Sequence, residues 1–122
     1  MPAEFKIDDE RGLIVSRAFG RVTDEDLQRH QQVLRADAAF DPRYDQLWDF
    51  LDVTEIAVSD EAIREFARAR SFEPEARRAL VAGSDLGFGL ARMFAALHDD
   101  APEEVQVFRS LEEARTWLGT EG

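Results

Sequence analysis

The sequence predicts a single α/β domain in which an N-terminal β-hairpin is followed by repeated strand–helix units. A chain of 122 residues suits one domain. Short apolar runs alternate along the chain with longer segments of helical periodicity, and strands joined through single helices become parallel neighbours. We therefore expect a mixed, mostly parallel five-stranded sheet with four helices.

The first two predicted strands form an antiparallel hairpin. Residues 4–8 alternate between apolar and charged side chains, with Phe5 and Ile7 on one side. Gly12 lies in the turn, where glycine adopts a positive φ without strain. The segment 13–22 is rich in residues that favour strands, and it is the second strand.

The first helix begins after Thr23 and ends before Pro42. The threonine hydroxyl can accept from free backbone N–H groups, and the acidic residues that follow suit the positive end of the helix dipole. Leu27, His30 and Leu34 recur at helical spacing and are expected on the buried side. Proline ends the helix because it disfavours helical backbone in the residue before it.

The third strand, 46–53, is expected at the centre of the sheet because it is apolar toward both faces, apart from Asp49. A carboxylate in such a strand is costly unless it is paired. We expect a structural ion pair between Asp49 and Arg92, which lies on a later helix. The alternative is a general base whose pKa is raised by burial.

The remaining strands and helices are each bounded by a capping residue or a turn. They are a helix from Ser59 to Arg70, a strand at 78–82, a helix at 86–98 capped by Ser84 or Asp85, a strand at 104–109, and a helix from a capping box at Ser110 to Gly119.

The composition argues against several functional classes. The chain has no cysteine, which excludes disulfides, thiol catalysis and thiolate metal sites. Its net charge of −11 disfavours nucleic acid and anionic membrane surfaces as partners. The N-terminal residues do not resemble a signal peptide, and no apolar run approaches the ~20 residues of a membrane span. We expect a cytoplasmic protein.

No convergent catalytic set is visible, so we expect no enzyme activity, cofactor or metal. The glycine-rich segment 83–89 joins a strand to a helix, a place where backbone amides can bind phosphate. It matches neither common nucleotide-binding motif, and Asp85 adds negative charge, so the glycines are expected to serve close packing instead. The run His98, Asp99 and Asp100 holds metal-ligating residue types, but adjacent residues rarely converge on one ion.

Four motifs that together span most of the chain carry a family resemblance. They are Leu47-Trp48-Asp49, Ala79-Leu80-Val81-Ala82, residues 88–93 and residues 107–118. Their order after a short hairpin resembles the STAS family, named for sulfate transporters and anti-sigma-factor antagonists. More narrowly, it resembles small bacterial STAS-like proteins with a CRAL-TRIO-type relationship. The resemblance implies one STAS-like domain over 1–122 and a regulatory role.

Ser59 is the candidate phosphorylation site that this resemblance implies. In anti-sigma-factor antagonists, a serine at the start of the helix after a central strand is the phosphosite. Here the segment reads Val58-Ser59-Asp60-Glu61-Ala62 instead of the usual Asp-Ser-Ser-Gly, and the two acidic residues would repel a phosphate. The alternative is that Ser59 acts only as a helix N-cap.

We expect a non-enzymatic STAS-like regulatory or protein-interaction module that binds a protein partner. The alternative is a binding protein for a small apolar or nucleotide-like ligand, with its site at the carboxyl ends of the parallel strands. The candidate ligand- or partner-binding residues are Asp52, Thr54, Ser59, Gly83, Ser84, Gly87, Phe88, Gly89 and Arg92. The aromatic residues expected to line any cavity are Trp48, Phe50, Phe66, Phe72, Phe88 and Phe94.

The third predicted helix also suggests a homodimer, because it is apolar around more than half of its circumference. The stripe expected to cover the sheet consists of Leu86, Leu90, Met93, Phe94 and Leu97. Phe88, Ala91 and Ala95 then need another partner, and Gly87 and Gly89 would let a second backbone come close. The alternative is that a neighbouring helix of the same chain covers this edge.

Overall fold

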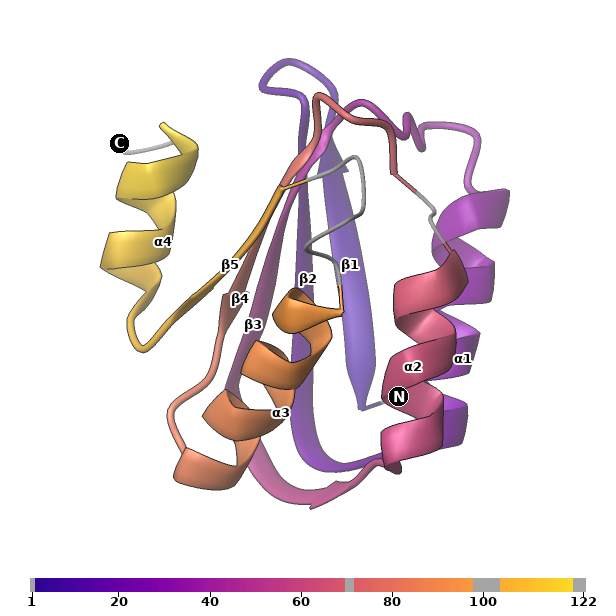
Figure 1. The fold of residues 1–122 in the computed structure, drawn as a ribbon. Helices are drawn as coiled ribbons and strands as arrows, with labels where there is room; N and C mark the ends of the chain where they lie inside the picture. The colour runs from indigo at the N-terminus through magenta and orange to yellow at the C-terminus, as the bar shows by residue number, and fades with distance from the viewer. Residues whose placement is uncertain (1, 70–71, 98–103, 120–122) are drawn as a thin grey trace.

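The computed structural model describes residues 2–69, 72–97 and 104–119, which form five strands and four helices (Figure 1). In chain order these are β1 (Ala3–Asp8), β2 (Leu13–Thr23), α1 (Asp24–Ala36), β3 (Asp45–Ala57), α2 (Asp60–Ala69), β4 (Arg77–Val81), α3 (Asp85–Ala96), β5 (Glu104–Phe108) and α4 (Leu111–Leu118). The predicted α/β fold class is confirmed. The predicted end of the second helix at Arg70 and the run 98–100 lie outside the described residues.

The strands form one sheet in the order β1-β2-β3-β4-β5. β1 pairs antiparallel with β2, and the other neighbours are parallel. Right-handed crossovers that always step to the next strand place their helices on one face of the sheet. Figure 1 shows α1, α2 and α3 on that face, the three-helix face, and α4 on the opposite one, the α4 face.

Each face of the sheet buries its own apolar side chains. On the three-helix face, Trp48 and Leu80 pack against helix residues that include Ile63 and Phe94. On the α4 face, the buried cluster consists of Leu13, Leu47, Ala79, Val81, Ala114 and Leu118. A third cluster joins the start of β2 to α1 through Ile14 and Leu34. Successive residues of a strand point to opposite faces, so Leu47 and Trp48 belong to different clusters.

The third strand is longer than predicted. It runs from Asp45 to Ala57 and pairs with β2 along most of that length, whereas β4 pairs only with residues 46–49. The strand is therefore central in its first part only. Leu51, beyond the β4 pairing, is 39% exposed.

The predicted helix starts are confirmed by capping hydrogen bonds. Serine or threonine hydroxyls accept from backbone N–H groups at 3.0–3.2 Å in four places: Thr23 from Asp26, Ser59 from Ala62, Ser84 from Gly87 and Ser110 from Glu113. Gly119 follows α4 with a φ of 73°, a left-handed conformation that glycine adopts without a steric penalty. These local signals depend on few residues, which is why the sequence predicts them well.

Candidate functional site

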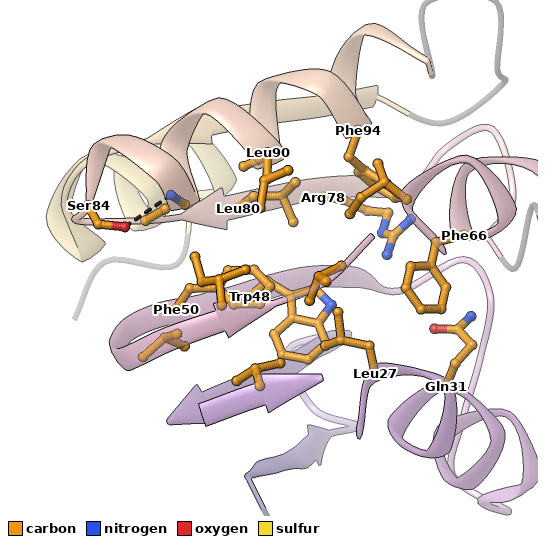
Figure 2. A pocket seen from close by; sticks show the side chains of 18 residues that line it. Leu27, Gln31, Trp48, Phe50, Phe66, Arg78, Leu80, Ser84, Leu90 and Phe94 are labelled. Carbon is orange, nitrogen blue, oxygen red and sulfur yellow. Dashed lines mark hydrogen bonds between the residues drawn. The ribbon is translucent and has the colours of Figure 1, made fainter. Parts of the chain in front are cut away.

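An apolar pocket lies between the three-helix face of the sheet and the helices that cover it (Figure 2). Its volume is about 120 Å³. Strand residues that line it include Val22, Trp48, Phe50 and Leu80, and helix residues include Leu27, Ile63, Phe66, Leu90 and Phe94. The pocket is thus bounded by β2, β3 and β4 together with α1, α2 and α3.

The polar residues of the pocket lie at its two ends. Figure 2 shows Gln31 and Arg78 near Phe66 at one end and Ser84 at the other. The Ser84 hydroxyl accepts from the backbone N–H of Gly87 at 3.0 Å, as the N-cap of α3. The arrangement is that of a small-molecule site, in which apolar walls hold a ligand and a few polar groups orient it.

Arg78 is 6% exposed and is held by hydrogen bonding and by aromatic rings. Its Nε donates to Gln46 Oε1 at 3.0 Å. Its guanidinium carbon lies 4.5 Å from the centre of the Phe72 ring and 5.2 Å from that of Phe94. Cation–π contacts of this kind fix the plane of the guanidinium.

A chain of buried hydrogen bonds extends from Arg78 to α1. Gln46 Nε2 donates to Ser16 Oγ at 3.0 Å, and Ser16 Oγ is hydrogen-bonded to His30 Nε2 at 2.9 Å. The His30 ring packs against Trp48 of the pocket, with ring centres 4.3 Å apart. This series of hydrogen bonds therefore connects one end of the pocket to the buried side of α1.

His30 is neutral at physiological pH. Burial, and then the nearby positive charge of Arg78, lower the pKa of His30 from 6.5 to about 4. Its Nδ1 is buried and, within the described part of the chain, makes no hydrogen bond. A protonated imidazole would place a second positive charge near Arg78 in a poorly solvated interior.

The structure places two of the residues predicted for ligand binding, Ser84 and Gly87, in the pocket wall. A Cβ at Gly87 would lie 2.9 Å from Ser84 Oγ and 3.3 Å from Ile56 Cδ1. Glycine at this position therefore lets α3 approach the sheet of its own chain closely. Gly89, in contrast, faces open space, because a Cβ there would meet no atom within 4 Å.

The other predicted residues lie outside the pocket wall. Asp52 accepts from Arg17 through Nε and Nη2 at 3.2 and 2.7 Å, and Thr54 is exposed. The carbonyl of Gly83 accepts from Arg109 at 3.1 Å. Of the aromatic residues expected around a cavity, Phe72 packs in the third apolar cluster and Phe88 lies under Arg109, whereas Trp48, Phe50, Phe66 and Phe94 line the pocket.

Ser59 has the geometry of an N-cap. Its backbone N–H and its hydroxyl both donate to the carboxylate of Asp24, each at 2.8 Å, and its Oγ accepts from Ala62. This contact ties the start of α2 to the start of α1. A phosphate on Ser59 would break the contact with Asp24 and face that carboxylate as well as Asp60 and Glu61.

The expected ion pair between Asp49 and Arg92 is absent from the structure, which describes both residues, and that prediction is wrong. Asp49 lies on the same face as Leu47, the α4 face, while Arg92 belongs to α3 on the other side of the sheet. The Asp49 carboxylate accepts from the backbone N–H of Leu51 at 2.9 Å and is only half-buried. The alternation of side chains along β3 therefore separates the two residues.

The rotation of α3 also differs from the prediction. Gly87, Ala91 and Phe94 are buried toward the sheet, so Ala91 does not need a second copy of the chain to cover it. Leu86 and Leu97, which were expected on the sheet side, are 61% and 45% exposed. Small residues along one line of the helix permit the close approach and thereby set its rotation.

Sequence reasoning missed Gln31 and Arg78, which supply the polar end of the pocket. Strand alternation held the signal for Arg78, because this cation shares a face with Leu80 and Ala82 in an apolar strand. Helical spacing held the signal for Gln31, four residues after Leu27.

Within residues 2–69, 72–97 and 104–119, no three His, Asp or Glu side chains gather as metal ligands. None of the described helices has the length and apolar character needed to cross a membrane.

Comparison with known proteins identifies the family. The SpoIIAA-like family model matches residues 13–119. No curated protein matches the chain. A crystal structure of an uncharacterised protein from the DUF3478 family, with a SpoIIAA-like fold, from Shewanella loihica PV-4, superimposes with a TM-score of 0.61 at 18% identity, covering 95% of this chain and 93% of that one. The expected resemblance to STAS-like domains is confirmed in family and fold, and this chain belongs to the SpoIIAA-like family.

Proposed function

We propose that the protein binds a small, mainly apolar ligand in the pocket between the sheet and α1, α2 and α3, and that it does so without catalysing a reaction. The observation that carries this proposal is the pocket itself. It is already formed in the folded chain, its walls are largely apolar and aromatic, and its few polar groups converge at its ends.

The size of the pocket limits the ligand. An apolar cavity of about 150 Å³ holds one benzene molecule. A pocket of about 120 Å³ therefore holds a ring or a short alkyl chain, and any larger ligand extends beyond it. An apolar ligand also suits these walls better than the nucleotide-like one considered from the sequence. Asp85 follows Ser84 at the end of the pocket opposite Arg78, and its negative charge would repel a phosphate.

Ligand binding is tested by the shift in melting temperature that a ligand of the folded state must produce. Indole and octan-1-ol are suitable neutral probes, and adenosine tests the nucleotide-like alternative. Ala91→Leu adds atoms to the pocket wall, so it should abolish the shift while the variant stays folded. Ala96→Leu makes the same change on the exposed side of α3 and should keep the shift.

Two outcomes contradict the proposal. One is the absence of any shift with indole or octan-1-ol at concentrations up to their solubility. The other is an equal shift in the wild type and in Ala91→Leu, which would place the ligand elsewhere on the protein.

A second candidate function is a regulatory module that binds a protein partner or a second copy of this chain. The exposed leucines of α3 favour it. Leu86 and Leu97 lie on one side of the helix together with half-buried Leu90 and Met93, at the spacing of a helix–helix seam. The two sites overlap at Leu90, which belongs both to this stripe and to the pocket wall. We further propose a cytoplasmic location. From the acidic composition we infer that neither nucleic acid nor membranes are targets.

A further inference from the structure

Trp48 carries a polar group that the described part of the chain leaves unpaired. Its side chain lines the pocket, and the residue is only 6% exposed. Within residues 2–69, 72–97 and 104–119, the indole N–H donates to no acceptor. A buried tryptophan N–H usually has a hydrogen-bond partner, because an unpaired one has lost its hydration without compensation. The indole N–H is therefore a donor that a ligand in the pocket can satisfy.

The packing of the indole leaves its edge, and not its faces, for a ligand. The Phe50 ring stacks against it, with ring centres 4.7 Å apart and planes inclined by 10°, and the centre of the His30 ring lies 4.3 Å away. His30 and Phe50 make no ring contact with each other, so they lie against opposite faces of the indole. Figure 2 shows the indole nitrogen on the edge directed toward the space beside Phe66.

This donor is within reach of the pocket and belongs to Trp48 alone. The fully enclosed side-chain nitrogen without a partner in the described residues is His30 Nδ1, whereas Trp48 Nε1 adjoins the pocket. Arg78 and Gln31, at the same end of the pocket, have further interactions within the chain, and the ligand needs no group from either of them.

A group that only donates selects a ligand atom that accepts. The indole nitrogen cannot accept a hydrogen bond. A carbonyl oxygen accepts and brings no N–H or O–H of its own, so no donor of the ligand is left unpaired against the largely apolar walls. An ionised group would lose far more hydration free energy there than a neutral one.

We propose, on the basis of the ligand-binding function above, that the ligand is a neutral carbonyl compound such as a ketone or an ester. Its oxygen accepts from Trp48 Nε1, and its ring or short alkyl chain fills the apolar pocket.

The test compares acetophenone with α-methylstyrene, which share a shape but differ in that only acetophenone has a carbonyl oxygen. Nitrogen–proton NMR of the full-length protein resolves the indole N–H signals of Trp48 and Trp117, the two tryptophans of the chain. Acetophenone should move the Trp48 proton signal to a higher chemical shift than α-methylstyrene does, because the ring currents of the two compounds are alike and only the ketone accepts. The Trp117 signal, from the α4 face, should stay in place with both.

Trp48→Phe removes the N–H and keeps an apolar ring. The ratio of the two affinities, measured by titration of the backbone amide signals, should shift about fivefold against acetophenone. Phe50→Leu takes a similar part of a ring from the same wall without removing a donor, so it should leave the ratio unchanged. If Trp48→Phe does not fold, the comparison of indole shifts in the wild type decides.

Equal shifts of the Trp48 proton with both compounds, binding of α-methylstyrene alone, or an unchanged affinity ratio in Trp48→Phe would overturn the carbonyl inference. Each of these outcomes leaves apolar ligand binding intact. If neither compound binds, the proposed function is overturned as well.

Discussion

Four polar side chains, His30, Ser16, Gln46 and Arg78, are buried together on the three-helix face of the sheet. They are linked in series by hydrogen bonds, which reduces the cost of burying them. The charge at one end of the series and the imidazole at the other influence each other, since the Arg78 charge contributes to the low pKa of His30. The protonation of His30 is therefore part of the stability of the fold.

Acid should destabilise the protein through His30. Its pKa is about 4 in the folded chain against 6.5 in the unfolded one, so the unfolded state binds the proton first as the pH falls. The contribution of neutral His30 to the free energy of unfolding is fully present above pH 6.5. It decreases by on the order of 3 kcal/mol as the pH falls to about 4. The free energy of urea-induced unfolding, measured across this pH range, tests the prediction.

The matched control is His30→Gln, which does not titrate and can still hydrogen-bond to Ser16. It should be less stable than the wild type at pH 7, and the difference between the two proteins should narrow toward pH 4. Parallel curves would show that His30 does not contribute to the pH dependence.

Asp49 should matter little for stability. Its carboxylate is half-buried and accepts one local backbone hydrogen bond, from Leu51. Asp49→Ala removes that bond and strands no cation, so we expect a loss of about 1 kcal/mol in the free energy of unfolding. A loss above about 3 kcal/mol would indicate a buried, paired charge after all. Asp52→Ala, which breaks the exposed contact with Arg17, is a suitable comparison.

At the scale of single elements, the sequence predicts what depends on neighbours along the chain. The caps at Thr23, Ser59 and Ser84 depend on a hydroxyl and an N–H three residues away, and they are found as expected. The pairing of Asp49 with Arg92 depended instead on which face of the sheet each residue occupies. The residue pattern within each segment leaves that open, because the two segments meet only in the folded sheet, where Asp49 and α3 lie on opposite sides.

The same distinction explains α3 and the pocket. Periodicity identified an apolar helix but not its rotation, because apolar residues surround much of the helix. The rotation is set by the close packing of Gly87 against Ile56. The aromatic walls of the pocket could be anticipated from composition. For its polar end, alternation along β4 and helical spacing in α1 indicate which side Arg78 and Gln31 occupy, but only the folded sheet shows that the two residues meet.

The helix α4, the only described helix on its face of the sheet, is held by Arg77. The Arg77 guanidinium donates to the carbonyl oxygens of Trp117 and Leu118, each at 2.8 Å, and so caps the C-terminal end of the helix. Its backbone N–H donates to Asp45 at 2.8 Å.

Arg77→Met should loosen α4, because the two carbonyl groups lose a charged donor. We expect a loss of about 1–3 kcal/mol in the free energy of unfolding. Arg35→Met removes an exposed arginine from the last turn of α1 and should cost much less. Fluorescence of Trp117 in a Trp48→Phe background should shift toward longer wavelength in Arg77→Met only. An unchanged free energy of unfolding in Arg77→Met would show that packing alone holds α4.

At the scale of the whole molecule, the sequential strand order gives the protein two unequal faces. Three crossover helices cover one face and enclose the pocket, and α4 covers part of the other. On the three-helix face, the outer surface of α3 exposes Leu86 and Leu97, and this helix lies directly over the pocket. Any partner that binds α3 would therefore contact the wall of the ligand site.

We expect a homodimer in which α3 packs against α3 of a second copy. Leu86, Leu90, Met93 and Leu97 follow one another at steps of four, three and four residues, the spacing of a seam between two helices. A symmetric contact of this kind is closed and buries the same stripe on both copies. Sedimentation equilibrium at micromolar concentration measures the association directly.

Leu86→Glu should dissociate the dimer, because it places a charge in the seam at the residue with the largest exposed apolar side chain of α3. Val33→Glu makes a comparable change at an exposed position of α1 and should leave the association unchanged. Phe88→Glu should also have little effect, because Phe88 lies under Arg109 of its own chain, 4.0 Å from the guanidinium carbon. A monomer at every concentration would exclude self-association. A dimer that tolerates Leu86→Glu but not Phe88→Glu would place the interface on the Gly83–Gly89 side of α3. Gly87 and Gly89 would then let the backbone of the second copy come close, as considered from the sequence.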